Sequence, residues 1–280
     1  MLLEYGAKVD AGDSGALKAP SGSGDIGVAQ LLLAQGADAN GRRKSETPIQ
    51  AVCSGGHLEL VELLLVNGAG PNAAGGNSGS ALSNACLSLN TALVSLLLDR
   101  GVHPDAMDER GCSALQRVFV RALDSDLKIV QLLLDRGADV NTRGGRLGTA
   151  LCEAAFANAV EVVRILLERG ADPNLWDNKF GSALQAACDN WQEKPELVQL
   201  LLDSGADVDI RGWSYGNALC AAIYNGIVES AHMLLDRGAH IDMRGGEYGN
   251  ALQIAIKKGL DDIRKKLLKR GWRIVIHKRT

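Results

Sequence analysis

The sequence predicts an all-α solenoid of stacked helix–turn–helix units, each followed by a projecting loop. Two phrases, one resembling Leu-Leu-Leu-x-x-Gly-Ala and one resembling Gly-(Ser/Thr/Asn)-Ala-Leu, recur with a period of about 33 residues. The chain has 280 residues, of which 46% are hydrophobic, only 4% are aromatic and 33 are Gly, which suits many thin layers better than one central core. The first phrase places Gly at positions 6, 36, 68, 101, 137, 170, 205, 238 and 271. The second phrase ends at Leu17, Ile49, Leu82, Leu115, Leu151, Leu184, Leu219 and Leu252.

The second phrase predicts the first helix of each unit. Residues of preferred N-cap types precede this helix, and their side-chain oxygens can accept an unpaired backbone N–H of the first turn. These residues are Thr47, Ser80, Ser113, Thr149, Ser182, Asn217 and Asn250. Small residues three and four positions beyond the anchor Leu let neighbouring helices approach closely. Cys53, Cys86 and Cys188 occupy the fourth position, so we expect buried thiols there.

The first phrase predicts the second helix and its end. Segments such as Leu127–Arg136 and Val160–Arg169 should be helical and should end at the recurring Gly, which accepts a left-handed conformation. Longer spacings predict short insertions between the two helices around 121–126 and 190–195. Pro20 falls in the first helix of the first unit and should disturb it.

These phrases resemble the ankyrin repeat across essentially the whole chain. The resemblance rests on Gly-Ala-Asp-Val-Asn at 137–141, on Gly-Gly-His-Leu-Glu-Leu-Val-Glu-Leu-Leu-Leu at 55–65 and on Thr-Pro-Ile at 47–49. It implies an ankyrin-repeat solenoid of helix–turn–helix units with β-hairpin fingers, stacked in a curve. The family's Thr-Pro-Leu-His is mostly Ser-Ala-Leu-Gln or Asn-Ala-Leu-Cys here, a variant similar to the C-terminal arrays of fungal receptor-like nucleoside-triphosphatase proteins.

The period divides the chain into a partial repeat, residues 1–11, and an ankyrin repeat domain of about eight repeats, residues 12–280. The expected repeats are 12–44, 45–77, 78–110, 111–146, 147–179, 180–214, 215–247 and 248–280. The chain opens inside a second helix, which is expected of a fragment of a longer receptor, an excised domain or a shortened product, whereas the coregulator alternative predicts a complete short protein.

Motifs for a cofactor site, a metal site or an active site are weak in this sequence. Residues 22–27 match Gly-x-Gly-x-x-Gly, but a dinucleotide site needs a preceding strand, and Gly24 is in register with Gly56 of a repeat turn. His57 is expected to bond to neighbouring backbone, and the other His residues lack Cys or His partners at zinc spacing. No phosphate loop occurs, so we expect no cofactor, no metal and no enzyme activity.

Net charge and hydropathy limit the classes of partner and the cellular compartments that we expect. The net charge of −3 gives no reason to expect direct nucleic-acid binding. No apolar run reaches the roughly 20 residues of a membrane span, and the first residues lack the basic region and apolar stretch that are typical of a signal peptide. We expect reduced cysteines, a monomer and a cytoplasmic or nuclear location.

The projecting loops carry the first candidate binding residues. Six positions beyond each recurring Gly, four successive loops present Arg143, Trp176, Arg211 and Arg244, joined by Trp213. Exposed Trp and Arg are enriched at binding hot spots, so this finger row is a candidate partner-binding site. The alternative is a row of solvated tips.

The first helices carry a second set of candidates. Two and five positions beyond the anchor, Arg117, Glu153, Phe156 and Tyr224 should face the groove. Leu147, Phe180, Tyr215 and Tyr248 share a slot before the helix cap and are interpreted as packing between fingers.

The C-terminal end differs in charge. Residues 257–280 hold ten Lys or Arg and two Asp, a net charge of +8. This end is either a nuclear address or acidic-partner site, or a solvated cap of the last helix.

The predicted function is a non-catalytic protein–protein interaction module, a scaffold or recognition arm that binds through its finger tips and concave face. The alternatives are a nuclear coregulator or signalling adaptor, and a small-ligand binder or enzyme that uses the groove.

Overall fold

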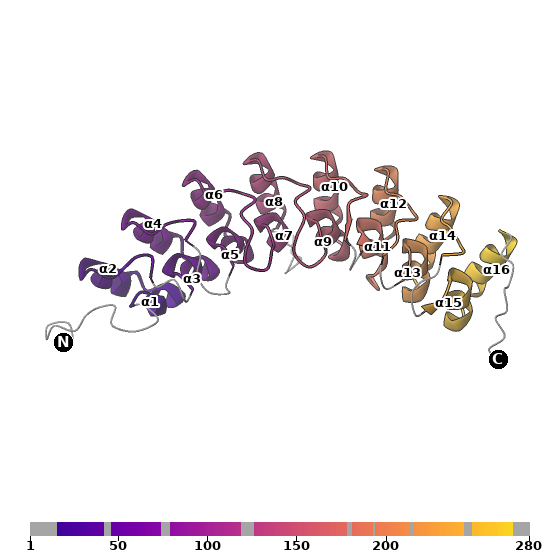
Figure 1. The fold of residues 1–280 in the computed structure, drawn as a ribbon, viewed down its shortest axis with the longest axis horizontal. Coiled ribbons are helices and arrows are strands. Elements are labelled where there is room, and N and C mark those ends of the chain that lie inside the picture. The colour runs from indigo at the N-terminus through magenta and orange to yellow at the C-terminus, as the bar shows by residue number, and fades with distance from the viewer. Residues whose placement is uncertain are drawn as a thin grey trace. The chain divides into compact units, whose positions relative to one another are not determined.

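The computed structural model describes residues 16–41, 46–73, 79–118, 126–177, 181–192, 194–212, 215–243 and 248–270. The chain forms two compact units, Met1–Gly145 and Arg146–Thr280. Each unit, within its described residues, is a row of antiparallel helix pairs (Figure 1). The expected partial repeat, residues 1–11, lies outside the described residues, and the predicted repeat boundaries remain predictions.

The first unit contains four helix pairs among its described residues. They are α1 (Lys18–Ser23) and α2 (Ile26–Ala34), α3 (Pro48–Gly55) and α4 (Leu58–Val66), α5 (Ala81–Leu87) and α6 (Thr91–Asp99), and α7 (Ala114–Arg117) and α8 (Asp126–Asp135). The first helices α1, α3, α5 and α7 pack in sequence, as do the second helices α2, α4, α6 and α8. The result is two helical layers.

The second unit repeats this arrangement. Its described residues form α9 (Ala150–Phe156) and α10 (Val160–Glu168), α11 (Ala183–Cys188) and α12 (Pro195–Asp203), α13 (Ala218–Asn225) and α14 (Val228–Asp236), and α15 (Ala251–Lys258) and α16 (Asp261–Lys269). A β-hairpin precedes α11, in which β1 (Trp176–Asp177) pairs antiparallel with β2 (Gly181–Ser182). A bridge between Gly212 and Gly216 starts a similar finger before α13.

Six of the seven predicted N-caps are confirmed, because the side chains of Thr47, Ser80, Ser113, Thr149, Asn217 and Asn250 each accept a backbone N–H of the following helix. Ser182 also precedes its helix, α11, but here the cap bond described is the one that its backbone N–H donates to Gln185 Oε1 over 3.0 Å. The recurring Gly residues in the described segments have φ between 82° and 90°. They therefore end the second helices as predicted.

Two sequence expectations about the first pair have different outcomes. Gly24 ends α1 with φ 75° and Asp25 caps α2, so the glycine motif is a repeat turn as predicted. A Cβ at Gly24 would lie 2.5 Å from His57 Cε1, so the imidazole fills the space that the missing side chain leaves. The expected disturbance at Pro20 was wrong, because Pro20 lies in the first turn of α1, where its missing N–H has no intrahelical partner to lose.

The core lies between the two helical layers and between successive pairs. Cys53, Cys86 and Cys188 have no exposed surface, which confirms the prediction of buried thiols. The predicted insertion around 121–126 falls largely outside the described residues. The one around 190–195 forms the connection between α11 and α12, and Pro195 is the first residue of α12.

Gln residues at the fourth position of the cap phrase join three helix starts to the next loop. Gln185 Oε1 accepts the Ser182 N–H, and its Nε2 donates to Gly216 O in the next finger. Gln50 and Gln116 bond in the same way to Gly79 O and Gly144 O. These three Gln residues therefore hold neighbouring repeats together.

Replacing Gln185 with Ala is expected to lower the free energy of unfolding by about 1–2 kcal/mol, because a buried N–H and a buried C=O lose their partner. Gln253 of α15 is the matched control, since it is exposed and only caps its own helix among the contacts described. Its Ala variant should lose about 0.5 kcal/mol or less. Urea unfolding followed by circular dichroism measures both. Equal losses would contradict the role of Gln185 between repeats.

Candidate protein-interaction surfaces

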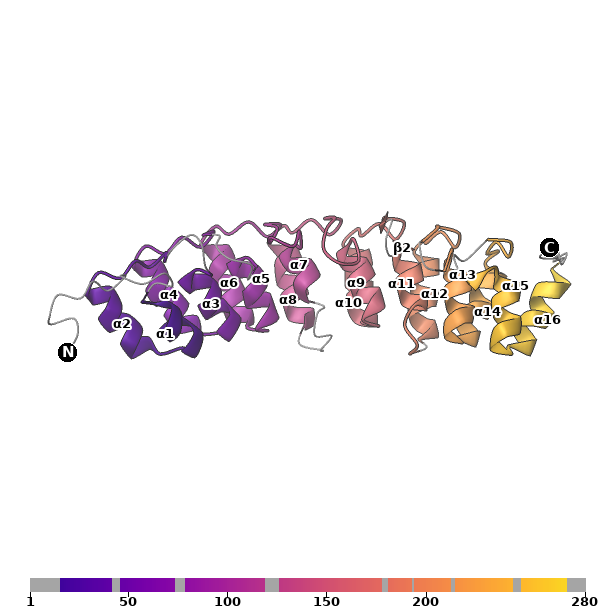
Figure 2. The same ribbon diagram turned by 60° about the horizontal axis from the view of Figure 1, so that its bottom comes forward.

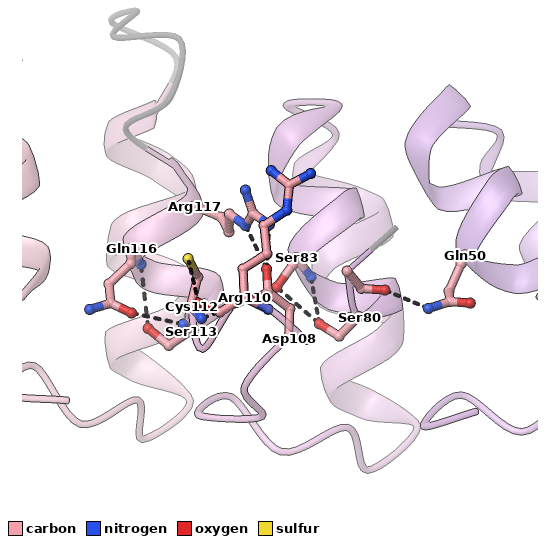
Figure 3. Close-up of polar contacts among 10 residues, drawn as sticks. Gln50, Ser80, Ser83, Asp108, Arg110, Cys112, Ser113, Gln116 and Arg117 are labelled. Atoms are coloured by element: carbon pink, nitrogen blue, oxygen red, sulfur yellow. Dashed lines mark hydrogen bonds and ion pairs between the residues drawn. The ribbon is translucent and has the colours of Figure 1, made fainter. Parts of the chain in front are cut away.

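In the first unit, Arg117 is held in a buried ion pair. Its Nη2 lies 2.5 Å and its Nε 2.6 Å from Asp108 Oδ2 (Figure 3). The Asp108 side chain has no exposed surface, and its Oδ1 accepts the N–H groups of Arg110 and Cys112 over 2.9 Å each. Arg117 keeps 13% of its side chain exposed. It therefore fixes a finger loop to α7 and offers little surface to a partner.

Beside this ion pair lies a small cavity of about 130 Å³. Pro71, Val102 and Met107 form much of its apolar wall, and Gln50 and Asp108 contribute polar atoms. Met107, which occupies the finger-row position of its loop, is 46% exposed. The cavity lies between the loops at 71–73 and 106–109 of the first unit.

The described finger-row residues are exposed, as expected. Arg143 lies near the end of the first unit, and Trp176 and Arg211 lie on successive fingers of the second unit. Trp176 is in β1 with 46% of its surface exposed. Trp213 and Arg244 lie outside the described residues, so their place in the row stays a prediction.

The fingers of the second unit are fixed by hydrogen bonds between neighbouring repeats. Asn174 Nδ2 donates to Gly205 O over 3.0 Å, and Asn174 Oδ1 accepts the Asp207 N–H over 2.7 Å. Asp209 Oδ1 accepts the His240 N–H over 2.8 Å. The backbone beneath Trp176 and Arg211 is therefore well supported.

Two first-helix candidates meet at the start of the second unit. Arg146 lies over the Phe156 ring, with 4.8 Å from Cζ to the ring centroid. The same guanidinium lies 3.3 Å from Glu153 Oε2, and Glu153 Oε1 accepts the Leu147 N–H over 3.0 Å. Arg146, which the sequence reasoning missed, thus joins Glu153 to Phe156.

The fourth first-helix candidate, Tyr224, belongs to an aromatic cluster. Its ring centroid lies 4.3 Å from that of Tyr248 and 5.0 Å from that of Tyr215. Tyr215 and Tyr248 stack at 5.5 Å, which confirms the predicted packing between their fingers. Lys258 Nζ lies 4.1 Å from the centroid of the Tyr224 ring. Leu147, from the same slot, is buried, and Phe180 lies outside the described residues.

Asp189 ties this tyrosine cluster (Tyr215, Tyr224 and Tyr248) to the end of α11. Burial raises the pKa of the Asp189 carboxyl, although hydrogen bonds from Asn225 and Tyr215 lower it in part. Burial, followed by the negative charge of Asp189, raises the pKa of the Tyr215 hydroxyl. Tyr215 therefore remains a hydrogen-bond donor to Asp189 at neutral pH. The cluster presents half-buried rings next to one carboxylate and one ammonium group.

Groups for catalysis or metal binding do not converge in the described part of the chain. No set of three or more His, Cys, Asp or Glu residues there is placed to hold a metal ion. Burial raises the pKa of the Cys220 thiol to about 12, and it also raises the pKa of Cys53 and Cys86. These thiols are therefore protonated at neutral pH. Within the same described segments, no helix is long and apolar enough to cross a membrane.

Much of the basic charge at the C-terminal end is paired. Lys266 Nζ lies 2.8 Å from Asp236 Oδ1 of α14, and Arg270 lies 3.5 Å from the same oxygen. Arg264 pairs with Asp261 one turn away in α16. The hydrogen bond from Lys266 lowers the pKa of Asp236. These contacts are typical of a solvated helix face, and the nuclear address stays a prediction.

Comparison with known proteins now identifies the family. A family model described as Ankyrin repeats (3 copies) matches residues 16–108, 82–177, 118–212 and 184–278. The chain belongs to the ankyrin repeat family. Ankyrin repeat domains are protein–protein interaction modules, so this is the function of the fold described above.

Two solved ankyrin structures are similar to this chain. The human ASB11 ankyrin repeat domain superposes with a TM-score of 0.66 at 26% identity, over 82% of this chain and 100% of that one. The ankyrin repeat domain of Bcl-3, a member of the IkappaB protein family, gives a TM-score of 0.63 at 27% identity, over 79% and 99%. Both confirm the ankyrin solenoid predicted from the sequence.

Two curated relatives are nematode proteins. An ankyrin repeat and KH domain-containing protein of Caenorhabditis briggsae is 35% identical over 129 residues, 45% of this chain. The ankyrin repeat and KH domain-containing protein mask-1 of Caenorhabditis elegans is 30% identical over 136 residues, 48% of this chain. The match spans only 5% of the length of each relative. The expected likeness to fungal arrays is not shown by these relatives.

Proposed function

We propose that this ankyrin domain binds a protein partner through the finger tips and the first-helix side of its second unit. The observation that carries the proposal is that Trp176 is 46% exposed on a finger whose backbone is fixed by the neighbouring repeat. Holding an aromatic side chain ready in this way lowers the entropy lost on binding.

Arg211 extends the surface along the fingers. It is exposed on the finger that follows Trp176, directly before the Gly212–Gly216 bridge. No ion pair of Arg211 is found among the described residues. Trp and Arg are the residue types that most often dominate the binding energy of an interface.

The first helices of the same unit add adaptable polar contacts. Arg146, Glu153 and Phe156 lie at α9, and the tyrosine cluster lies at α13 and α15. Tyrosine rings combine apolar contact area with a hydroxyl that can hydrogen-bond, which suits a protein surface. Of the first-helix candidates, Phe156 and Tyr224 remain in the proposed site, whereas Arg117 and Glu153, whose side chains are 13% and 12% exposed, are assigned mainly structural roles.

The proposal describes a non-catalytic module that acts as a scaffold or as the recognition arm of a larger protein. A cytoplasmic or nuclear location, a monomeric state and membership of a receptor-like array remain proposals of the same kind. A small ligand in the groove is the weaker candidate, because the described residues bring together no set of His, Cys, Asp and Glu side chains that could hold a metal ion.

The test compares the protein captured from the source cell by the wild-type chain with its capture by a Trp176→Ala/Arg211→Ala variant. The affinity for the captured protein is expected to fall about tenfold or more, because two exposed hot-spot side chains are removed. Leu31→Ala/Arg100→Ala is the matched control, since Leu31 is exposed on α2 and Arg100 is exposed directly after α6, both in the first unit.

Circular dichroism must show that both variants keep the helix content of the wild type. An unchanged affinity of the finger variant would exclude Trp176 and Arg211 from the interface. An equal loss in the control variant would show that the effect is not specific to the fingers.

A further inference from the structure

The connection between α11 and α12 exposes a second tryptophan. Trp191 has 77% of its surface exposed, compared with 46% for Trp176 on the finger edge. Exposure of a single apolar side chain is common at protein surfaces. What distinguishes Trp191 is how firmly the residues on both sides of it are held.

Hydrogen bonds fix the backbone on either side of Trp191. Before it, Asn190 Nδ2 donates to Phe156 O over 2.8 Å, and Asn190 Oδ1 accepts the Gln192 N–H over 3.0 Å. After it, Gln192 O accepts from Asn158 Nδ2 over 3.0 Å. The connection is therefore fastened to the neighbouring α9–α10 turn, and the indole is held out from a prepared backbone.

A lysine close to Trp191 also bonds to the neighbouring turn. Lys194 Nζ donates to Asn158 O over 2.8 Å. Asn158 has a left-handed backbone, with φ 57°, and is almost fully buried. The ammonium group thus holds the turn together from within.

This turn edge lies away from the surface proposed above. Figure 2 shows the α11–α12 connection at the opposite edge of the second unit from the finger loops. Within this unit, the turns between first and second helices line one edge and the fingers line the other. A partner bound at Trp191 would contact residues that the finger site does not use.

The edge around Trp191 carries an excess of negative charge. The first turns of α10, α12 and α14 each present one exposed carboxylate, from Glu161, Glu196 and Glu229. Acidic residues in a first turn also complement the helix dipole. Arg164 pairs with Glu161 over 3.6 Å. The first turn of α16 also carries two exposed carboxylates, Asp261 and Asp262, but these pair with Arg264 and Lys265 of the same helix.

Neighbouring turns are joined, so these carboxylates flank Trp191. Asn225 Nδ2, at the end of α13, donates to Cys188 O at the end of α11 over 2.9 Å. On the other side, the bond between Asn158 and Gln192 joins the α9–α10 turn to the Trp191 connection. The acidic first turns of α10, α12 and α14 are therefore consecutive along this edge.

We propose that Trp191 and the flanking carboxylates form a second docking surface, which binds a basic segment of a protein partner. A Lys or Arg side chain of the partner lies on the indole face, where cation–π attraction is strongest for Trp. Neighbouring basic residues of the segment pair with Glu196 and Glu161 or Glu229. Glu196 lacks a described ion-pair partner within the chain.

The test uses arrays of short synthetic peptides that differ in their content of Arg, Lys, Glu and aliphatic residues, probed with the full chain. The wild type is expected to retain Arg- and Lys-rich peptides. Fluorescence anisotropy then measures the dissociation constant of a retained peptide. Trp191→Ala is expected to weaken binding about tenfold or more. Trp191→Leu should weaken it similarly, because leucine keeps apolar area but lacks a π face.

Trp176→Ala is the matched control and should change the affinity less than about twofold. Glu196→Lys should also weaken binding, and added salt should weaken wild-type binding because the ion pairs are exposed. The proposal is overturned if the wild type retains no basic peptides, if Trp191→Ala leaves the affinity unchanged, or if Trp176→Ala abolishes the same binding. The last result would assign the basic peptides to the finger site instead.

Discussion

Replacing Arg117 with Met is expected to lower the free energy of unfolding by about 3 kcal/mol or more, a large effect for a single change. The reason is that Asp108 has no exposed surface and would remain as a buried carboxylate without its cation. Met keeps most of the apolar stem of Arg, so the loss of stability measures the effect of removing the guanidinium group. Urea unfolding followed by circular dichroism measures the change.

Arg136→Met is the control for this prediction. Arg136 Nη1 lies 2.6 Å from Asp99 Oδ1, a distance similar to that in the buried pair. The two side chains are 36% and 58% exposed, however, so this pair should contribute less than about 1 kcal/mol. If the two Met variants lost the same stability, burial of Asp108 would not be the cause.

Replacing Ile223 with Ala is expected to destabilise the chain by about 2–4 kcal/mol, through lost apolar burial and the cavity that remains. Ile223 lies four residues beyond the anchor Leu219 and has no exposed surface. Helix α13, which carries Ile223, packs against α15 of the next helix pair. The same unfolding measurement gives the magnitude.

Ile256 is an internal control, because it occupies the same position of its repeat, four residues beyond Leu252. It is 54% exposed in α15. Its Ala variant should lose about 0.5 kcal/mol or less, although the chemical change is identical. Similar losses at both positions would contradict the conclusion that stacking of the next helix pair creates the buried site.

Periodicity was sufficient to predict the helices, because the same helix caps and helix-ending Gly residues recur in each repeat. Each cap residue and each recurring Gly acts on backbone groups within a few residues, and such local effects can be read from a single chain. The burial of Cys53, Cys86 and Cys188 could be predicted equally well, since the spacing from the anchor Leu or Ile determines the helix face.

Contacts between a loop and a helix were harder to predict. Arg117 was expected to face a groove, and its position two residues beyond Leu115 supports that expectation. The pair with Asp108 depends on the path of the preceding finger, which the repeat period does not specify. Polar side chains that reach nine residues back along the chain follow the fold of that loop rather than the helix face.

The surface contacts of the second unit could be predicted from the sequence only in part, for a similar reason. The shared slot of Tyr215 and Tyr248 indicated their contact, but the approach of Lys258 and Asp189 depends on side-chain directions. The insertion near Trp191 was visible as a change in repeat length. Its exposure and its hydrogen bonds to the neighbouring turn were not visible from the sequence.

The most direct test of the central claim, that the fingers and first helices of the second unit bind the protein partner, is site-specific photo-crosslinking. A photoreactive amino acid is placed at Trp176, at Arg211 or at Tyr224, and at Leu31 and Val66 as exposed controls in the first unit. Crosslinks to one captured protein from the first three positions, and from neither control, are the predicted result. Crosslinks that form at the controls, or that fail at all three positions while the same protein is still captured, would contradict the claim.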